Sequence, residues 1–263
     1  MMGETIAVAN QKGGVGKTTT CVNLAASLAA SNRRVLLIDL DPQGNATTGC
    51  GIAKESLERS TCDVVLGETR IQDAIISVFD DLFSLLPGNA DLTLAEIRLL
   101  EEPERELTLR KIVEPIRGLY DYLLIDCPPT INMLTLNALT AADGALIPIQ
   151  CEYYALEGLS ALLETVKQVR NTVNHDLQIK GLLRTMYDPR NRLAIEVSAQ
   201  LTKHFGDQVY ATVIPRNVRL AEAPSFGRPV MFHDRNSQGA KAYLALAAEV
   251  MAQELDAGEL VVA

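Results

Sequence analysis

Residues 11–20, QKGGVGKTTT, have the composition and setting of a loop that binds phosphate groups. The run follows an apolar, β-prone segment and precedes a helical pattern that begins near residue 17. Glycines let the backbone wrap around a polyphosphate, so that N–H groups and the helix N-terminus point at the anion. Lys17 would then reach the β- and γ-phosphates, and the Thr18 hydroxyl would bind Mg²⁺. The residues predicted to line the nucleotide here are Lys12, Gly13, Gly14, Val15, Gly16, Lys17, Thr18 and Thr19.

Two aspartate motifs complete a candidate site for hydrolysis. The apolar run 34–39 is followed after one residue by Asp41, and the apolar run 122–126 ends in Asp126. Parallel strands place their carboxyl ends at one edge of a sheet, where ligands bind. Because Mg²⁺ in proteins keeps several waters, Asp126 is predicted to hold a water of the metal. Asp41 is predicted to orient the water that attacks the γ-phosphate, because phosphoryl transfer depends on positioning more than on proton abstraction.

Strand and helix patterns alternate along the whole chain without repeats or low-complexity linkers. This alternation predicts an α/β fold: a doubly wound, mostly parallel sheet with helices on both faces, as in P-loop NTPases, forming a single domain over residues 1–263. Strands are expected at 5–9, 34–39, 82–86, 122–126, 145–149, 179–186 and 209–214, and helices near 17–31, 91–117, 131–141, 154–172, 191–205 and 238–256.

The phosphate-binding loop departs from the usual pattern in two positions. Gln11 stands where a glycine is usual, and a second lysine, Lys12, follows it. The resulting K-G-G-V-G-K-T resembles the deviant loop of the ParA/MinD group of P-loop ATPases. The switch runs 39–45 and 126–129 and the stretch 213–227, IPRNVRLAEAP at its centre, resemble the ParA/Soj branch in particular. The resemblance covers nearly the whole chain.

The ParA/Soj resemblance implies an ATPase that uses ATP and Mg²⁺ and forms a homodimer with ATP sandwiched between the subunits. Lys12 would reach the partner's phosphates, so that Lys12, Lys17 and Asp41 are the predicted catalytic residues. Pro215 and Asn217 would lie beside adenine, with Met186 packed against the base.

The same resemblance implies non-specific binding of double-stranded DNA and partitioning of a chromosome or plasmid. The net charge is −9, yet residues 180–241 contain ten Lys and Arg against five Asp and Glu. A local basic surface suffices for contact with phosphates. Arg190 and Arg219 are the preferred contacts, and the further candidates are Arg192, Lys203, Arg216, Arg228 and Lys241. A ParB/Spo0J-type adaptor with a basic N-terminal peptide and a cytoplasmic, nucleoid-associated location are also implied.

Three other classes remain open at this stage. A MinD-like, membrane-cycling ATPase would need a basic amphipathic terminal helix, whereas residues 253–263 are acidic, so no membrane is expected. An iron–sulfur carrier would need cysteines at a bridging spacing, and the five cysteines, Cys127 among them, show none. A small-molecule ligase or kinase would need an acceptor pocket that no motif indicates.

Overall fold

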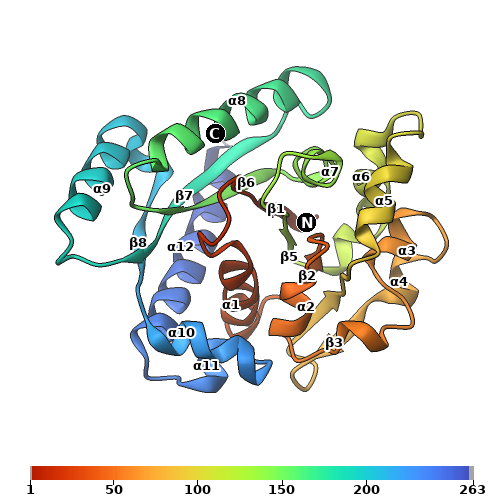
Figure 1. The fold of residues 1–263 in the computed structure, drawn as a ribbon, viewed down its shortest axis with the longest axis horizontal. Coiled ribbons are helices and arrows are strands. Elements are labelled where there is room, and N and C mark those ends of the chain that lie inside the picture. The colour runs from red at the N-terminus through yellow and green to blue at the C-terminus, as the bar shows by residue number, and fades with distance from the viewer. Residues whose placement is uncertain (1, 261–263) are drawn as a thin grey trace.

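A computed structural model describes residues 2–260, with side chains for residues 2–253. Its centre is an eight-stranded sheet with the order β3-β4-β2-β5-β1-β6-β7-β8 (Figure 1). All neighbouring strands pair in parallel except β3 and β4, which form an antiparallel hairpin. The strands are β1 Glu4–Val8, β2 Val35–Asp39, β3 Ile76–Val78, β4 Phe83–Leu86, β5 Tyr122–Asp126, β6 Gly144–Gln150, β7 Gln178–Tyr187 and β8 Val209–Pro215.

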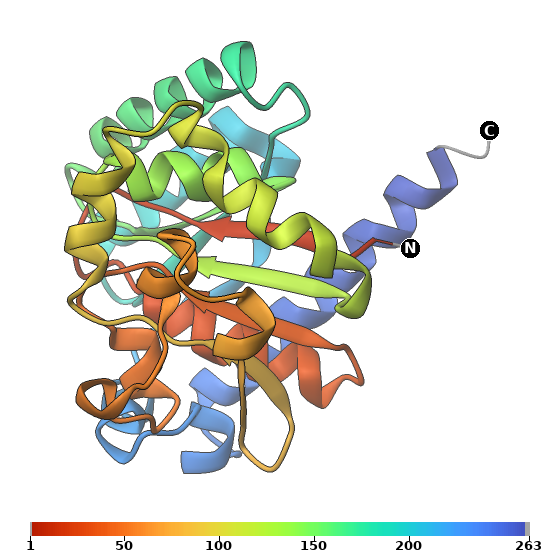
Figure 2. The same ribbon diagram turned by 90° about the vertical axis from the view of Figure 1, so that its right-hand side faces the viewer.

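Both faces of the sheet are buried, which explains why the central strands are almost continuously apolar. Along β1 the side chains alternate between two cores: Ile6 and Val8 belong to one, Ala7 and Ala9 to the other. Figure 2 shows the strands between two layers of helices, and the arrowheads of β1 and β5 lie on the side opposite the chain termini.

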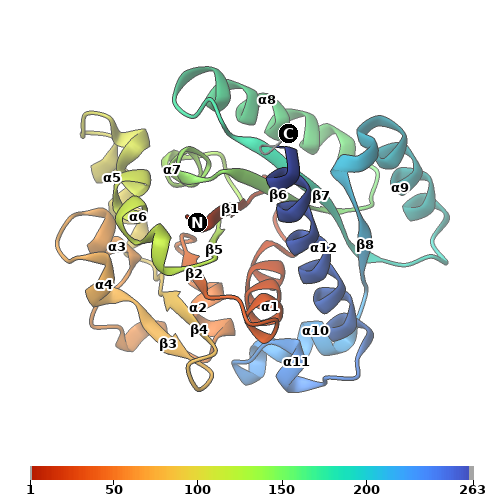
Figure 3. The same cartoon turned by 180° about the vertical axis from the view of Figure 1, so that it is seen from behind.

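One helical layer consists of α1, α2, α10, α11 and α12, and the other of α3 to α9 (Figures 1 and 3). The helices are α1 Lys17–Ala30, α2 Asn45–Gly49, α3 Thr61–Val65, α4 Ile71–Ala74, α5 Leu92–Leu99, α6 Thr108–Val113, α7 Met133–Ala141, α8 Ala155–Thr172, α9 Arg192–Phe205, α10 Val218–Glu222, α11 Val230–His233 and α12 Gln238–Leu260. The predicted α/β fold class is therefore confirmed.

The predicted single helix over 91–117 is wrong. The structure has α5 and α6, joined by turns and a short 3₁₀ segment, and a second 3₁₀ segment at Glu114–Leu119. Pro103 and Pro115 lie in the two interruptions, where a proline lacks the N–H that a helix interior needs. The sequence patterns also missed strand β3 and the short helices α2, α3, α4, α10 and α11, because elements of three to five residues show too little periodicity.

The strand order changes direction at β1, which lies between β5 and β6. In doubly wound sheets the crevice at such a switch point is where ligands bind. The loop that follows β1 is the glycine-rich run, so the topology places the predicted phosphate-binding loop at that crevice.

Close backbone packing holds the ends of β2 and β4 together. A Cβ added to Gly88, just after β4, would lie 2.5 Å from the carbonyl oxygen of Asp39. We expect Gly88→Ala to reduce the free energy of unfolding by about 1–3 kcal/mol, because the strand ends must separate to admit the methyl group. Gly118→Ala is the matched control, since a Cβ there meets nothing within 4 Å. Equal urea midpoints for the two variants would contradict this account.

Candidate nucleotide-binding site

The loop between β1 and α1 presents its backbone to an anion. Gly14 and Gly16 have φ values of 76° and 90°, a left-handed conformation that glycine adopts at low cost. Gly16 is the N-cap of α1, and no side chain caps the helix. The first N–H groups of α1 are therefore free of internal caps and face the groove at the helix N-terminus, where an anion is stabilised.

Lys17 lies at the base of this groove and is only 6% exposed. Its Nζ donates a hydrogen bond to the carbonyl oxygen of Lys12 at 3.3 Å. Burial lowers the pKa of Lys17, while the nearby carboxylate of Asp126 opposes that shift. A buried cation next to open N–H groups gives the site its attraction for phosphate. The groove measures about 300 Å³ and is lined by Gly13, Gly14, Gly16, Lys17, Thr18, Thr19, Asp41, Gln43, Asn45, Pro129 and Met186.

Asp39 and Asp126 end adjacent strands and are paired in register, so two carboxyl groups meet inside the protein. Both are fully buried. Burial raises the pKa of Asp39 to about 6, against the lowering effect of hydrogen bonds from Thr47. Burial and the carboxylate of Asp39 raise the pKa of Asp126 to about 8, an effect that the nearby Thr18 hydroxyl partly offsets. Two buried carboxylates repel each other, and a cation bound between or beside them would reduce this repulsion.

Asp126 has an unused acceptor oxygen that could bind a water ligand of a metal ion. Its Oδ2 is buried and accepts no hydrogen bond, whereas Oδ1 accepts a weak one from the Cys21 thiol at 3.5 Å. The residues thus fit Mg²⁺ held through Thr18 and a water on Asp126. Among the described residues, no group of three or more His, Cys, Asp or Glu side chains could hold a metal alone. Phosphate oxygens would have to complete the coordination of the ion.

Asp41 lines the phosphate groove and is 6% exposed. Its Oδ1 accepts a hydrogen bond from the backbone N–H of Gln43, and its carbonyl oxygen accepts one from Gly44. These bonds form a tight turn that aims the carboxylate into the groove. The structure therefore brings Lys17, Thr18, Asp41 and Asp126 to one place.

Thr47 is a site residue that the motifs did not indicate. Its N–H and hydroxyl both donate to Oδ2 of Asp39, at 2.8 and 2.7 Å. The hydroxyl also accepts a hydrogen bond from the N–H of Gly88 at 2.8 Å. Thr47 therefore joins helix α2 to the ends of β2 and β4 and fixes the turn that carries Asp41. Its only sequence signal is a hydroxyl residue eight positions after an aspartate.

Met186, Pro215 and Asn217, predicted to lie beside adenine, line one cavity of about 190 Å³. This cavity shares Gly16, Thr19 and Met186 with the phosphate groove, so the two are continuous. Met186 has a φ of 47°, a left-handed conformation that is costly for a residue other than glycine. Strain of this kind is found where a side chain is held for a ligand.

Lys12 does not point at the groove of its own chain. Its Nζ forms an ion pair of 2.6 Å with Oε2 of Glu152, and the two side chains are 39% and 47% exposed. Exposed pairs of this kind contribute less than about 1 kcal/mol, so Lys12 can exchange this partner for another at low cost.

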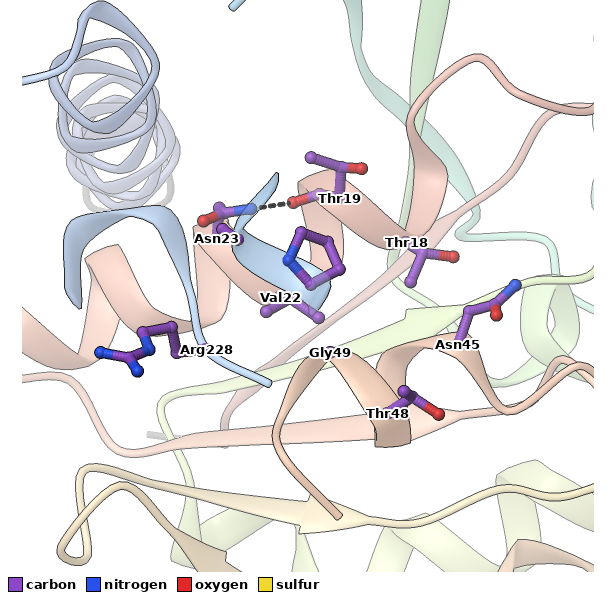
Figure 4. A pocket seen from close by; sticks show the side chains of 10 residues that line it. Thr18, Thr19, Val22, Asn23, Asn45, Thr48, Gly49 and Arg228 are labelled. Atoms are coloured by element: carbon purple, nitrogen blue, oxygen red, sulfur yellow. Dashed lines mark hydrogen bonds between the residues drawn. The ribbon is translucent and has the colours of Figure 1, made fainter. Parts of the chain in front are cut away.

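A third cavity, of about 280 Å³, borders the phosphate groove and shares Thr18, Thr19 and Asn45 with it. Figure 4 shows Thr18 and Asn45 near one end and Arg228 at the other, with Val22 and Gly49 between α1 and α2. Asn23 is held by a hydrogen bond to the Thr19 carbonyl oxygen. The cavity forms where α1 and α2 meet the segment 223–228, which lies more than 170 residues further along the chain.

The structure separates the predicted DNA contacts into two groups. Arg190 is paired with Asp188 at 2.8 Å, and Arg219 with Glu222 at 2.9 Å. Arg192 is likewise paired with Glu196 at 2.9 Å. The remaining candidates are exposed and form no ion pair with any side chain of residues 2–253; they are Lys203, Arg216, Arg228 and Lys241.

Comparisons with known proteins decide the family. The family model described as "AAA domain" matches residues 3–179. The sporulation initiation inhibitor protein Soj of Bacillus subtilis is 51% identical over 95% of this chain and 99% of its own. The chromosome partitioning protein ParA of Caulobacter vibrioides is 50% identical over 95% of each chain. The chain belongs to the ParA/Soj family of P-loop ATPases.

Solved structures agree with this ParA/Soj fold. Cobyrinic acid a,c-diamide synthase from Mycobacterium smegmatis, with bound ADP and magnesium, matches at 38% identity and a TM-score of 0.83, over 95% of this chain and 94% of that one. The cell division ATPase MinD of Pyrococcus furiosus matches at 26% identity and a TM-score of 0.80, over 96% and 100%. The ADP and magnesium of the first structure agree with the predicted ligands, ATP and Mg²⁺.

The buried carboxylate of Asp126 gives a pH-dependent prediction. Its pKa is raised in the folded protein, so stability is highest below the unfolded pKa and falls as pH rises toward 8. Asp126→Asn cannot titrate. Without Mg²⁺, its free energy of unfolding relative to the unsubstituted protein should therefore increase by about 1.4 kcal/mol per pH unit between pH 5 and 7. Urea titrations at several pH values measure this, with the exposed Asp207→Asn as control. A constant difference over that range would contradict the assignment.

Proposed function

We propose that this ParA/Soj-family chain hydrolyses ATP and, as an ATP-bound homodimer on DNA, drives partitioning of a chromosome or plasmid. The observation that supports this most directly is the phosphate groove. Buried Lys17 and Asp41 line it at the open N-terminus of α1, and the unpartnered oxygen of Asp126 is buried beneath it, near Lys17. Sequence identity near 50% to Soj and ParA supports the choice of process.

Each residue of the groove has a distinct task in this proposal. Lys17 and the N–H groups of the loop hold the β- and γ-phosphates and offset their charge. Thr18 and Asp126 hold Mg²⁺, the second through a water. The metal, when bound, neutralises charge that develops on the phosphate oxygens. Asp41 orients the attacking water from a turn that Thr47 and Asp39 hold rigid.

Lys12 acts in trans in this proposal. Its ammonium group points out of its own groove toward Glu152. On dimerisation it leaves Glu152 and binds the triphosphate of the other subunit, supplying a positive charge as an arginine finger does. ATP then stabilises the contact between the subunits, and hydrolysis weakens it. The rate of hydrolysis therefore sets the lifetime of the dimer.

The DNA contacts come from the basic segment 180–241, through phosphates and without sequence readout. In this proposal a ParB/Spo0J-type adaptor acts on the DNA-bound dimer. Because the dimer binds chromosomal or plasmid DNA, the protein would be found in the cytoplasm, on the nucleoid. The described helices include none that could span a membrane. The acidic residues 253–263 argue against a MinD-like membrane helix. Apart from Gln253, their side chains lie outside the part of the chain that the structure describes.

Two rival classes find less support. Cys127 is fully buried, as are the other cysteines, so no thiol is presented for a cluster shared between subunits. One structural relative is named a synthase, which suggests a ligase as an alternative function. Its sequence identity to this chain is 38%, lower than the 51% of Soj from Bacillus subtilis and the 50% of ParA from Caulobacter vibrioides. Dependence of ATP turnover on DNA rather than on an organic acid would distinguish the two.

We expect Asp41→Ala to bind ATP and Mg²⁺ but to hydrolyse ATP about a hundredfold more slowly, because water positioning is lost while Thr18 and Asp126 remain. The variant should accumulate as an ATP-bound dimer that stays on DNA. Size-exclusion chromatography and DNA retention with ATP, ADP and a slowly hydrolysed analogue measure both effects, with exposed Asp81→Ala as control. A monomeric elution of Asp41→Ala with ATP would contradict the proposal.

The proposed role of the basic segment in DNA binding can be tested by two kinds of substitution: one reverses the charge of its arginines, and the other removes the ion-pair partner of an arginine. Arg190→Glu with Arg219→Glu should abolish DNA binding and flatten its salt dependence by about one unit of slope per lost contact. ATP-dependent dimerisation should persist.

The matched variant Asp188→Asn frees Arg190 from its ion pair and should strengthen DNA binding at low salt. Anisotropy with a labelled duplex across a salt series measures both variants. Unchanged affinity in the double variant would place the DNA-facing surface elsewhere.

A further inference from the structure

A cavity of about 310 Å³ lies between the tip of the β3–β4 hairpin and the segment 226–232. Figures 1 and 3 show this tip beside α11. The cavity, called the aromatic pocket below, is lined by Phe79, Asp80, Phe226, Gly227, Arg228 and Phe232. None of these residues lines the phosphate groove or the cavity assigned to adenine, so the aromatic pocket is separate from both.

The phenylalanine rings of the pocket form two separate surfaces. The ring centroids of Phe79 and Phe232 are 5.6 Å apart, and the guanidinium carbon of Arg228 lies 5.7 Å from the centroid of Phe226. No ring contact joins Phe226 to Phe79 or Phe232 in the described structure. Phe226 and Phe232 are 57% and 45% exposed. Exposed aromatic rings gathered at a cavity indicate a binding site, and flat rings favour a flat ligand that can stack on them.

The hairpin tip has an unusual backbone. Phe79, Asp80 and Asp81 have φ values of 54°, 54° and 63°, so three consecutive residues other than glycine are left-handed. Such residues normally occur singly, and strained conformations cluster at sites that hold a ligand. In this conformation the tip brings Phe79 into contact with Phe232 and places Asp80 at the wall of the pocket.

Two opposite charges line the pocket without pairing. Asp80 and Arg228 are both exposed and form no ion pair with each other or with another side chain of residues 2–253. An ionised carboxylate only accepts hydrogen bonds, and a guanidinium only donates them. A ligand that satisfies both groups therefore carries N–H donors at one end and an anion at the other.

We propose that the aromatic pocket binds a free guanine nucleotide. The base stacks on the phenylalanine rings, its N1–H and N2–H groups donate to the carboxylate of Asp80, and its phosphate pairs with Arg228. Adenine and cytosine present one amino group beside an unprotonated ring nitrogen, which a carboxylate would repel. An aromatic side chain of a partner protein would stack equally well but would leave both charges unpaired. The site is independent of the partition function.

GMP is the probe, because it lacks the β- and γ-phosphates that Lys17 is placed to hold. It is titrated by calorimetry into the full chain saturated with Mg²⁺ and a slowly hydrolysed ATP analogue. GMP should bind, and AMP should bind at least about tenfold more weakly. Phe232→Ala should weaken GMP binding by at least about tenfold, because a stacking surface is lost. Asp80→Asn should remove most of the preference for GMP over AMP.

The control is Tyr153→Ala, which removes a ring that is 75% exposed but lies outside the pocket. GMP affinity should not change in this variant. Phe232→Ala should still bind the ATP analogue, which shows that the variant is folded. Equal GMP affinity in Phe232→Ala and the unsubstituted protein would overturn the proposal, as would an absence of GMP binding.

Two further ligands identify the occupant. Inorganic phosphate that binds as tightly as GMP would reduce the site to an anion contact of Arg228 and overturn the proposal. A short single strand of DNA that contains guanine carries the same base and phosphate. Tighter binding of this strand than of GMP, weakened by Phe232→Ala, would overturn the free nucleotide in favour of a strand. Failure of the unsubstituted protein to retain duplex DNA with ATP would instead overturn the partition function, whichever result GMP gives.

Discussion

The buried meeting of Asp39 and Asp126 at the ends of β2 and β5 is the constraint on which the site depends. Burial raises the pKa of both carboxyl groups, and the charge of Asp39 raises the pKa of Asp126 further. Asp39 is satisfied by Thr47, and Asp126 retains an oxygen without a partner. The folded protein therefore carries buried carboxyl groups that a bound cation would stabilise in their charged form.

Rigid backbone supports that arrangement. Gly88 lets β4 approach Asp39 closely, and Gly51 and Gly227 let α2 pack directly on the 3₁₀ turn after α10. In each place a side chain would separate elements that must remain in contact. The turn that carries Asp41 is thus fixed from two sides, by the sheet through Thr47 and by the C-terminal segment through these glycines.

The exposed charges are arranged differently from the buried ones. Lys12, Arg190 and Arg219 each have a carboxylate partner on the surface, and such pairs can be exchanged for phosphate at small cost. Arg190 and Arg219 can therefore exchange their carboxylate partners for the phosphates of a polyanion.

The sequence by itself determined the fold class, the phosphate loop and the family, because these depend on local patterns: glycines before Lys17, apolar runs that end in aspartate, and alternating elements. It did not determine the division of 91–117 into two helices or the short elements α2 to α4, which owe their conformation to packing rather than to periodicity. Only the tertiary structure brought Thr47 and Gly88 to Asp39 and paired Lys12 with Glu152, over separations of 8 to 140 residues. Such contacts depend on where the ends of the strands lie relative to one another in the folded sheet. Residue types and their spacing in the sequence do not specify that arrangement.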